Sequence, residues 1–174
     1  MIRSLEGKTP RVAASAFVSE AAYVVGDVEI GEGSNVWPGA VIRGDFGRIR
    51  IGSKVSVEDN CVVHSGTPSS PVGDVDIGDR VLIGHGAVLN GRKIGNDVLI
   101  GMNATVLHDA EIGNECIVAA GCLVGQGMIV PDRSLVVGVP GRIKGEPTEG
   151  QLWWVRDGIK EYEALVRRYR SEGL

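Results

Sequence analysis

An aliphatic residue recurs at every sixth position over most of this chain, and this spacing limits the possible folds more than any other feature of the sequence. We call each such position a rung. The longest uninterrupted run of rungs comprises Ile94, Ile100, Val106, Ile112, Val118, Val124, Val130 and Val136. A period of six fits neither the 3.6-residue repeat of an α-helix nor the two-residue alternation of a single strand. It predicts a triangular coil of about 18 residues, whose three flat sides stack on the next coil at about 4.8 Å.

Rungs also occur earlier in the chain, in blocks that run from Val12 to Ile42, from Ile51 to Val63 and from Ile77 to Leu89. If the side that contains Ile30 is numbered one, Ile-Gly pairs recur on side one at 30–31, 51–52, 77–78, 94–95 and 112–113. Glycine suits a corner with a positive φ angle, so we expect the coil to turn there in that conformation. The stacked sides would bury continuous Val and Ile columns, at roughly 1.5–3 kcal/mol for each fully buried rung. These columns therefore supply the core.

The three cysteines, Cys61, Cys116 and Cys122, each stand four residues after a rung. Other residues in this position are mostly small, which indicates an inward-facing slot. An odd number of cysteines at wide spacing fits neither a disulfide framework nor a CxxC metal site. We therefore expect buried free thiols.

A C-terminal helix is predicted beyond the last rungs. Residues 144–147 are expected to form a linker, and Thr148 can serve as the N-cap of the helix that follows. Apolar residues then recur at steps of three and four, at Leu152, Val155, Ile159, Tyr162, Val166 and Tyr169. This spacing is typical of one buried helix face. Gly158 would lie inside the helix at a cost of about 1 kcal/mol.

The length of 174 residues favours a single core. We expect a parallel β-helix over residues 1–145 and a C-terminal helix over residues 146–174. The apolar face of this helix would pack on the chain's own β-helix or on a neighbouring subunit.

The charge pattern excludes several classes of partner. The chain has 22 acidic and 18 basic residues with no long run of one sign, so we expect no nucleic-acid or membrane partner. It has no apolar stretch of about 18 residues, and its first residues do not lead into a signal-like apolar core. These features predict a soluble, cytoplasmic protein.

Three breaks interrupt the ladder: nine residues from Ile42 to Ile51, fourteen from Val63 to Ile77, and five from Leu89 to Ile94. Segments extruded from a rigid scaffold often carry function. On side three, the residue just after the rung is Arg43, then His64, then Asn90, which predicts one column across three coils. Counting back from the next Ile-Gly corner places His108 one coil further along this column.

His85 stands two residues after a rung of side two, alongside Asp59 from the preceding coil. It therefore lies on a different side from His64, and one chain would have difficulty bringing both onto a common cation. Packing side two of one subunit against side three of another could do so, which predicts a metal site at a subunit interface. The alternative is that each histidine only hydrogen-bonds a neighbouring coil, because the spacing contains no HxH or HExxH motif.

Four motifs stand out along the chain: Arg43-Gly44-Asp45, Asp59 to His64, Ile83 to Leu89, and Leu135 to Gly141. Together they resemble the motifs of the γ-class carbonic anhydrases and their relatives. The likeness covers nearly the whole chain, including the terminal helix. It implies an all-β fold, a left-handed parallel β-helix of hexapeptide repeats with a C-terminal α-helix, assembled as a homotrimer. It also implies a zinc ion, or iron or cobalt, at each subunit interface, with two ligands from one chain and a third from its neighbour.

The resemblance assigns His64 and His85 to two of the metal-ligand positions, whereas Asn90 stands where the family has a third histidine. Asparagine offers a carbonyl oxygen in place of an imidazole nitrogen, which should weaken zinc binding. His108 could compensate only if its side chain reached across about one coil spacing, roughly 4.8 Å.

The same likeness places Glu58 where the family has a glutamine beside the metal-bound water, and Asp59 where it has a carboxylate beside the site. Arg43 and Asp45 match a pair that links subunits and orders the site, and a purely structural interface ion pair is the alternative. The best-studied members have an acidic proton-shuttling loop, whereas the segment from Ser65 to Gly73 has no Asp or Glu.

The implied activity is the reversible hydration of CO2 to bicarbonate, a carbonate dehydratase (lyase) reaction that uses a metal-activated water. In this interpretation the histidines hold the ion, Glu58 and Asp59 orient the water, and Arg43 positions bicarbonate. One alternative is an acyltransferase that uses acetyl-CoA, although the longest interruption of the ladder is short for the acceptor-covering loop of such enzymes. Another is a non-catalytic trimeric metal-binding or assembly protein, which Asn90 favours.

Overall fold

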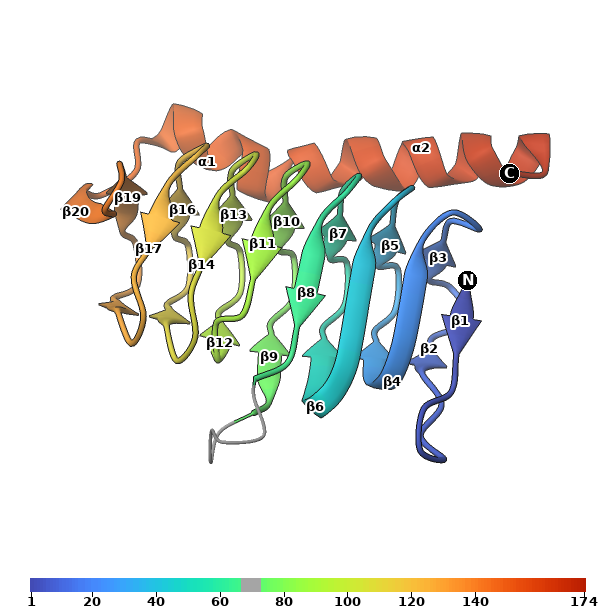
Figure 1. The fold of residues 1–174 in the computed structure, drawn as a ribbon. Helices are drawn as coiled ribbons and strands as arrows, with labels where there is room; N and C mark the ends of the chain where they lie inside the picture. The colour runs from blue at the N-terminus through green and yellow to red at the C-terminus, as the bar shows by residue number, and fades with distance from the viewer. Residues whose placement is uncertain (67–72) are drawn as a thin grey trace.

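The computed structural model describes residues 1–66 and 73–174, which form a solenoid of short parallel strands with two helices along one flank (Figure 1). Side one contains β2 (Arg11–Val12), β9 (Val75–Ile77), β12 (Lys93–Ile94), β15 (Glu111–Ile112) and β18 (Ile129–Val130). Side two contains β3 (Phe17–Val18), β5 (Asn35–Val36), β7 (Ser56–Val57), β10 (Leu82–Ile83), β13 (Leu99–Ile100), β16 (Ile117–Val118) and β19 (Leu135–Val137). Side three contains β1 (Ile2–Arg3), β8 (Val62–His64), β11 (Val88–Leu89), β14 (Thr105–Val106) and β17 (Leu123–Val124). The longer strands β4 (Tyr23–Ile30) and β6 (Val41–Ile51) bend from side three into side one and join the two into one sheet.

The rungs stack in the register that the period predicted. Across the longest break, Ile51 pairs with Ile77 on side one and Val63 pairs with Leu89 on side three. The interruptions are therefore extruded, and the columns on either side of them remain aligned. The buried rungs form one continuous hydrophobic cluster, and the three cysteines are free and buried, as predicted. The predicted parallel β-helix is confirmed, while its left-handed sense and the division at residue 145 stay predictions.

The corner glycines of side one have a different role from the predicted one. Gly31 and Gly78 are not at positive φ. Instead, a Cβ atom at Gly31 would lie 2.5 Å from the carbonyl oxygen of Gly52 in the next coil, so the close stacking of coils requires glycine. Positive φ occurs at turn residues such as Lys54 and Asp97, both at 57°.

The outward positions just before the side-one rungs carry charges of alternating sign. In coil order they are Arg11, Glu29, Arg50, Asp76, Lys93 and Glu111. Arg11 lies 2.9 Å from Glu29, and Arg50 lies 3.8 Å from Glu29 and 3.6 Å from Asp76. We call these six residues the charge column. Each inner member stands between two residues whose charge is opposite to its own.

The C-terminal segment forms two consecutive helices, α1 (Glu149–Arg156) and α2 (Gly158–Glu172), where one was predicted. Thr148 caps α1 as expected and accepts a hydrogen bond from the backbone N–H of Gln151. The helix breaks at Asp157. Gly158 is buried, and a Cβ atom there would lie 3.0 Å from the ring of Trp154, so glycine allows this ring to pack at the break.

Both helices pack on side two of the chain that carries them. Leu152 and Val155 of α1 form a buried cluster with Ile117. In α2, the rings of Tyr162 and Tyr169 lie 5.9 and 5.1 Å from the ring of Trp37. No helix in residues 1–66 or 73–174 is both long enough and apolar enough to cross a membrane.

The predicted linker begins too early. Lys144 and Gly145 belong to β20 (Arg142–Gly145), which pairs antiparallel with β19 at the end of the solenoid. This antiparallel strand lies beside the last strand of side two, where the stacking of hexapeptides ends.

Candidate functional site

The column predicted on side three is present in three consecutive coils. Arg43 pairs in register with His64, and Asn90 follows in the next coil. The Nδ2 atom of Asn90 lies 3.4 Å from Nδ1 of His64 and 3.2 Å from its carbonyl oxygen. The parallel strands β6, β8 and β11 thus bring a guanidinium, an imidazole and an amide into one row.

Asp45 orients His64 from the side of the ring opposite Asn90. The Oδ1 atom of Asp45 lies 2.9 Å from Nε2 of His64, and Arg43 forms an ion pair with Oδ2 of Asp45. Although burial acts to raise it, the hydrogen bonds from His64 and Arg43 hold the pKa of the Asp45 carboxyl below its ordinary value. The carboxylate therefore accepts a hydrogen bond from the Nε2–H group of His64, and the lone pair of Nδ1 faces the amide nitrogen of Asn90.

The segment that carries Asp45 folds tightly against the preceding coil. A Cβ atom at Gly44 would lie 2.6 Å from the carbonyl oxygen of Asp27, so a glycine is needed between Arg43 and Asp45. Phe46 follows, with its ring centroid 5.7 Å from that of His64, and it is 49% exposed. Phe46 was not predicted as part of the site, although its place in the nine-residue break was a usable signal.

His85 lies between two carboxylates. Its Nδ1 atom is 2.9 Å from Asp59 and its Nε2 atom is 3.0 Å from Glu58. The same oxygen of Glu58 also accepts the backbone N–H of His85 at 2.9 Å. Glu58 is buried, whereas the Asp59 side chain is 42% exposed. The predicted neighbourhood of His85 and Asp59 is confirmed, and the direct contact with Glu58 is new.

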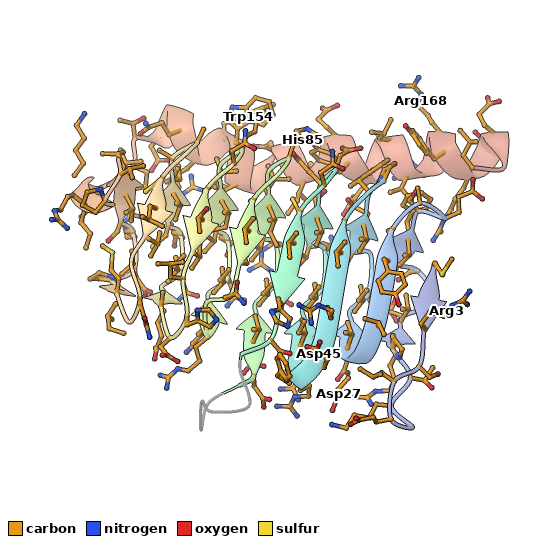
Figure 2. The ribbon with its side chains drawn as sticks, viewed as in Figure 1. Arg3, Asp27, Asp45, His85, Trp154 and Arg168 are labelled. Carbon is orange, nitrogen blue, oxygen red and sulfur yellow. The ribbon has the colours of Figure 1, made fainter. Side chains whose placement is uncertain are left out.

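The site residues form two separate groups within one chain. Figure 2 shows His85 beside the C-terminal helices, and Asp45, the partner of His64, at the opposite edge of the solenoid from these helices. Glu58 and Asp59 accompany His85 and do not approach His64. Among the residues described, no three His, Cys, Asp or Glu side chains come together in a way that could hold a metal.

The predicted place of His108 is wrong by one residue. Leu89 pairs with Val106, so Leu107 stands level with Asn90 and His108 falls in the turn that follows. The step from Leu89 to Ile94 is five residues, one fewer than the period of six. Counting back from the next Ile-Gly corner ignores this missing residue, and so it places His108 one position too early.

Tyr162 was predicted only as part of the apolar face of the helix. Burial raises the pKa of the Tyr162 phenol, and the negative charge of Glu58 acts in the same direction. The two residues line a cavity of about 400 Å³ between the helices and side two, together with Trp154. No period in the sequence signals this cavity, because its lining residues come from separate elements.

Sequence and structure comparisons agree with this architecture. The family model "Bacterial transferase hexapeptide (six repeats)" matches residues 93–126, and the model "Hexapeptide repeat of succinyl-transferase" matches residues 74–107. A solved structure of a hexapeptide transferase family protein from Anaplasma phagocytophilum is 33% identical, covers 97% of each chain and superposes with a TM-score of 0.89.

Two curated relatives match nearly the whole chain. Carnitine operon protein CaiE from Escherichia coli K12 is 38% identical over 95% of this chain and 82% of its own length. Gamma carbonic anhydrase 2 from the mitochondria of Arabidopsis thaliana is 36% identical over 95% of this chain and 60% of its own length. On these matches, the chain belongs to the hexapeptide-repeat family that includes the γ-class carbonic anhydrases.

Proposed function

We propose that this protein is a γ-class carbonic anhydrase-like metalloprotein that catalyses the reversible hydration of CO2. The observation that carries the proposal is the arrangement around His64. Asp45 engages one ring nitrogen, and the other faces Asn90 at 3.4 Å in the adjacent coil. Carboxylate–histidine pairs of this kind orient imidazoles in metal sites.

The donor atoms suit a zinc, iron or cobalt ion. His64 and Asn90 offer an imidazole nitrogen and an amide oxygen from one chain, and His85 of a second copy would add another imidazole. These are ligands that divalent transition metals accept, although three imidazoles would bind zinc more tightly. Because His64 and His85 belong to separate groups of residues within one chain, the proposed site is shared between subunits of a homotrimer.

A bound cation would supply an activated water that attacks CO2 at neutral pH. Asp45 holds the ring of His64, and Arg43 neutralises Asp45 while its half-exposed guanidinium remains able to bind the bicarbonate anion. Glu58 holds His85 from the buried side. Asp59, which is more exposed, would arrive at the shared site with His85 and accept a hydrogen bond from the water.

Metal analysis of protein purified without chelator, combined with a CO2-hydration assay, tests this proposal. We expect metal and activity in the wild type, loss of both in His64→Ala, and a gain of both in Asn90→His, which restores a third imidazole. His108→Ala is the matched control and should behave as the wild type, because His108 lies outside the column. The proposal fails if the wild type holds no metal and Asn90→His gains none.

Assembly is tested separately by sedimentation. We expect the mass of a trimer, and a monomeric mass would contradict the shared site.

The second candidate is an acyltransferase, because both matching family models carry transferase names. Such an enzyme needs room to cover an acceptor, and the longest interruption here is the fourteen-residue step from Val63 to Ile77. Formation of an acetylated product from acetyl-CoA would favour this candidate. A trimer with metal but with neither activity would favour the non-catalytic alternative.

A further inference from the structure

The only Asn-Gly pair in the chain is Asn90-Gly91, at the start of the five-residue step from Leu89 to Ile94. Asparagine is a thermolabile residue, because the backbone nitrogen of the next residue can attack its side-chain amide carbon. Glycine favours this attack, since it has no Cβ atom to hinder the approach. In a folded chain, the packing decides whether the glycine is required and whether its nitrogen is engaged elsewhere.

The shortened coil requires glycine at position 91. A Cβ atom there would lie 2.7 Å from Cγ1 of Val106 and 3.3 Å from the carbonyl oxygen of Ala110. Val106 is a fully buried rung with a branched side chain, so it has little room to move aside. The fold therefore keeps a glycine directly after Asn90.

The backbone nitrogen of Gly91 is left out of the ladder of hydrogen bonds between coils. The N–H of Asn90 donates to Val106 at 2.9 Å, and the N–H of Arg92 donates to Ala110 at 2.9 Å. Gly91 is buried between them, and its N–H has no acceptor among the residues that the structure describes. Buried backbone N–H groups nearly always have an acceptor, so this one is unusual. No hydrogen bond from the described residues holds the nitrogen away from the side chain of Asn90.

The amide of Asn90 is held only weakly. Its Nδ2 atom lies 3.2 Å from the carbonyl oxygen of His64 and 3.4 Å from Nδ1 of the same residue, both long for hydrogen bonds. Asn96 and Asn114 differ, because the Oδ1 atom of each accepts a backbone N–H of the preceding coil, at 2.8 and 2.9 Å. Asn90 thus combines a weakly bound amide with an unengaged neighbouring nitrogen.

We propose that Asn90 is a site of spontaneous deamidation. A bond forms between the backbone nitrogen of Gly91 and Cγ of Asn90, while the bond from Cγ to Nδ2 breaks. Nδ2 leaves as ammonia, with the hydrogen that the Gly91 nitrogen gives up. Water then opens the cyclic imide and leaves an aspartate, or an isoaspartate, at position 90. Each turn of the reaction consumes one water molecule and releases one molecule of ammonia.

The reaction replaces a neutral amide by a carboxylate beside His64. In the metal site proposed above, an aspartate would offer an anionic oxygen in place of the amide oxygen, and carboxylate oxygen is an established ligand of zinc. This consequence rests on the proposed function. The deamidation itself depends only on the Asn-Gly pair and its surroundings.

Peptide mass spectrometry tests the proposal on the whole chain, stored at mildly alkaline pH and physiological temperature. Trypsin releases residues 81–92 as one peptide, in which Asn90 is the only asparagine, and residues 94–133 as another, which contains Asn96, Asn103 and Asn114. Fresh and stored samples are digested identically, so that deamidation during digestion is subtracted. We expect peptide 81–92 to gain about 1 Da on storage, as an amide becomes a carboxyl, and peptide 94–133 to stay unchanged.

Asn90→Gln is the matched control, because its longer side chain would have to close a larger ring, and its amide should persist. The proposal is overturned if peptide 81–92 of the wild type gains no mass beyond the fresh sample. It is equally overturned if peptide 94–133 gains mass as fast.

The consequence for metal binding is measured separately on Asn90→Asp, which carries the aspartate from the start. We expect it to bind zinc about tenfold more tightly than freshly prepared wild type, by competition with a chromophoric chelator. Equal affinities, or no binding by either protein, would contradict the proposed metal site. The peptide masses alone decide the deamidation.

Discussion

Replacing Asp45 probes the proposed metal site through a residue that is not itself a proposed ligand. Its carboxylate contacts Nε2 of His64 at 2.9 Å and pairs with Arg43, and its side chain is 17% exposed. Removing such a partner of a ligating histidine typically lowers metal affinity about 10- to 100-fold. We expect Asp45→Ala near the upper end. Asp45→Asn keeps an acceptor oxygen but loses the charge, which roughly halves the strength of the hydrogen bond, so we expect a loss of about tenfold.

The assay is zinc affinity by chelator competition, with urea unfolding of the same samples as a check on folding. Asp74→Asn is the matched control. Asp74 pairs with Arg48 at 3.4 Å and accepts the backbone N–H of Arg48 at 2.8 Å. Arg48 lies in the same break as Asp45, so this variant changes a neighbouring ion pair without touching His64. The reasoning is refuted if Asp45→Ala binds zinc as tightly as the wild type, or if Asp74→Asn weakens binding equally.

Three further predictions concern the solenoid. A Cβ atom at Gly95 would lie 2.8 Å from the backbone of the next coil, so Gly95→Ala should lower the free energy of unfolding by about 1–3 kcal/mol, measured by urea titration. Gly125→Ala is the control and should leave the free energy of unfolding unchanged, because a Cβ atom there would have no neighbour within 4 Å. Ile100 is fully buried, and Ile100→Ala should cost about 2–5 kcal/mol by the same measurement, while a cost below about 0.5 kcal/mol would contradict the stacked core. Burial raises the pKa of the Cys61 thiol to about 11, so about one molecule in a thousand carries the thiolate at pH 8, and this thiol should react with a disulfide reagent only after denaturation.

The period of six was sufficient to predict which strand positions pair between coils. The rungs are aliphatic, and after each break the chain has to return to the position where the next rung stacks on the previous coil. The contact of His64 with Asn90 followed directly from that register. The same reasoning failed at His108. The coil there is one residue shorter, so Val106 still aligns with Leu89 while His108 falls in the turn instead of beside Asn90. It also misjudged the corner glycines, since the approach of two backbones depends on coil spacing and leaves no separate mark in the sequence.

The contacts between the helix and the solenoid could not be predicted from spacing. Tyr162 fits an apolar stripe as well as any aliphatic residue would, and only the packing of α2 on side two shows that it lines the same cavity as Glu58. The break at Asp157 depends on the ring of Trp154 packing over Gly158, a contact between side chain and backbone that helical periodicity does not report.

The charge column of side one has a consequence for folding fidelity. The aliphatic rungs of successive coils are nearly interchangeable, so the core alone distinguishes poorly between pairing with the next coil and pairing with the one after it. A chain that skipped one coil would set Arg11 against Arg50, or Glu29 against Asp76, and like charges in facing strand positions are destabilising by roughly 0.2–1 kcal/mol each. The alternation thus disfavours pairing that skips a coil, whereas the correct order sets opposite charges against each other along the column.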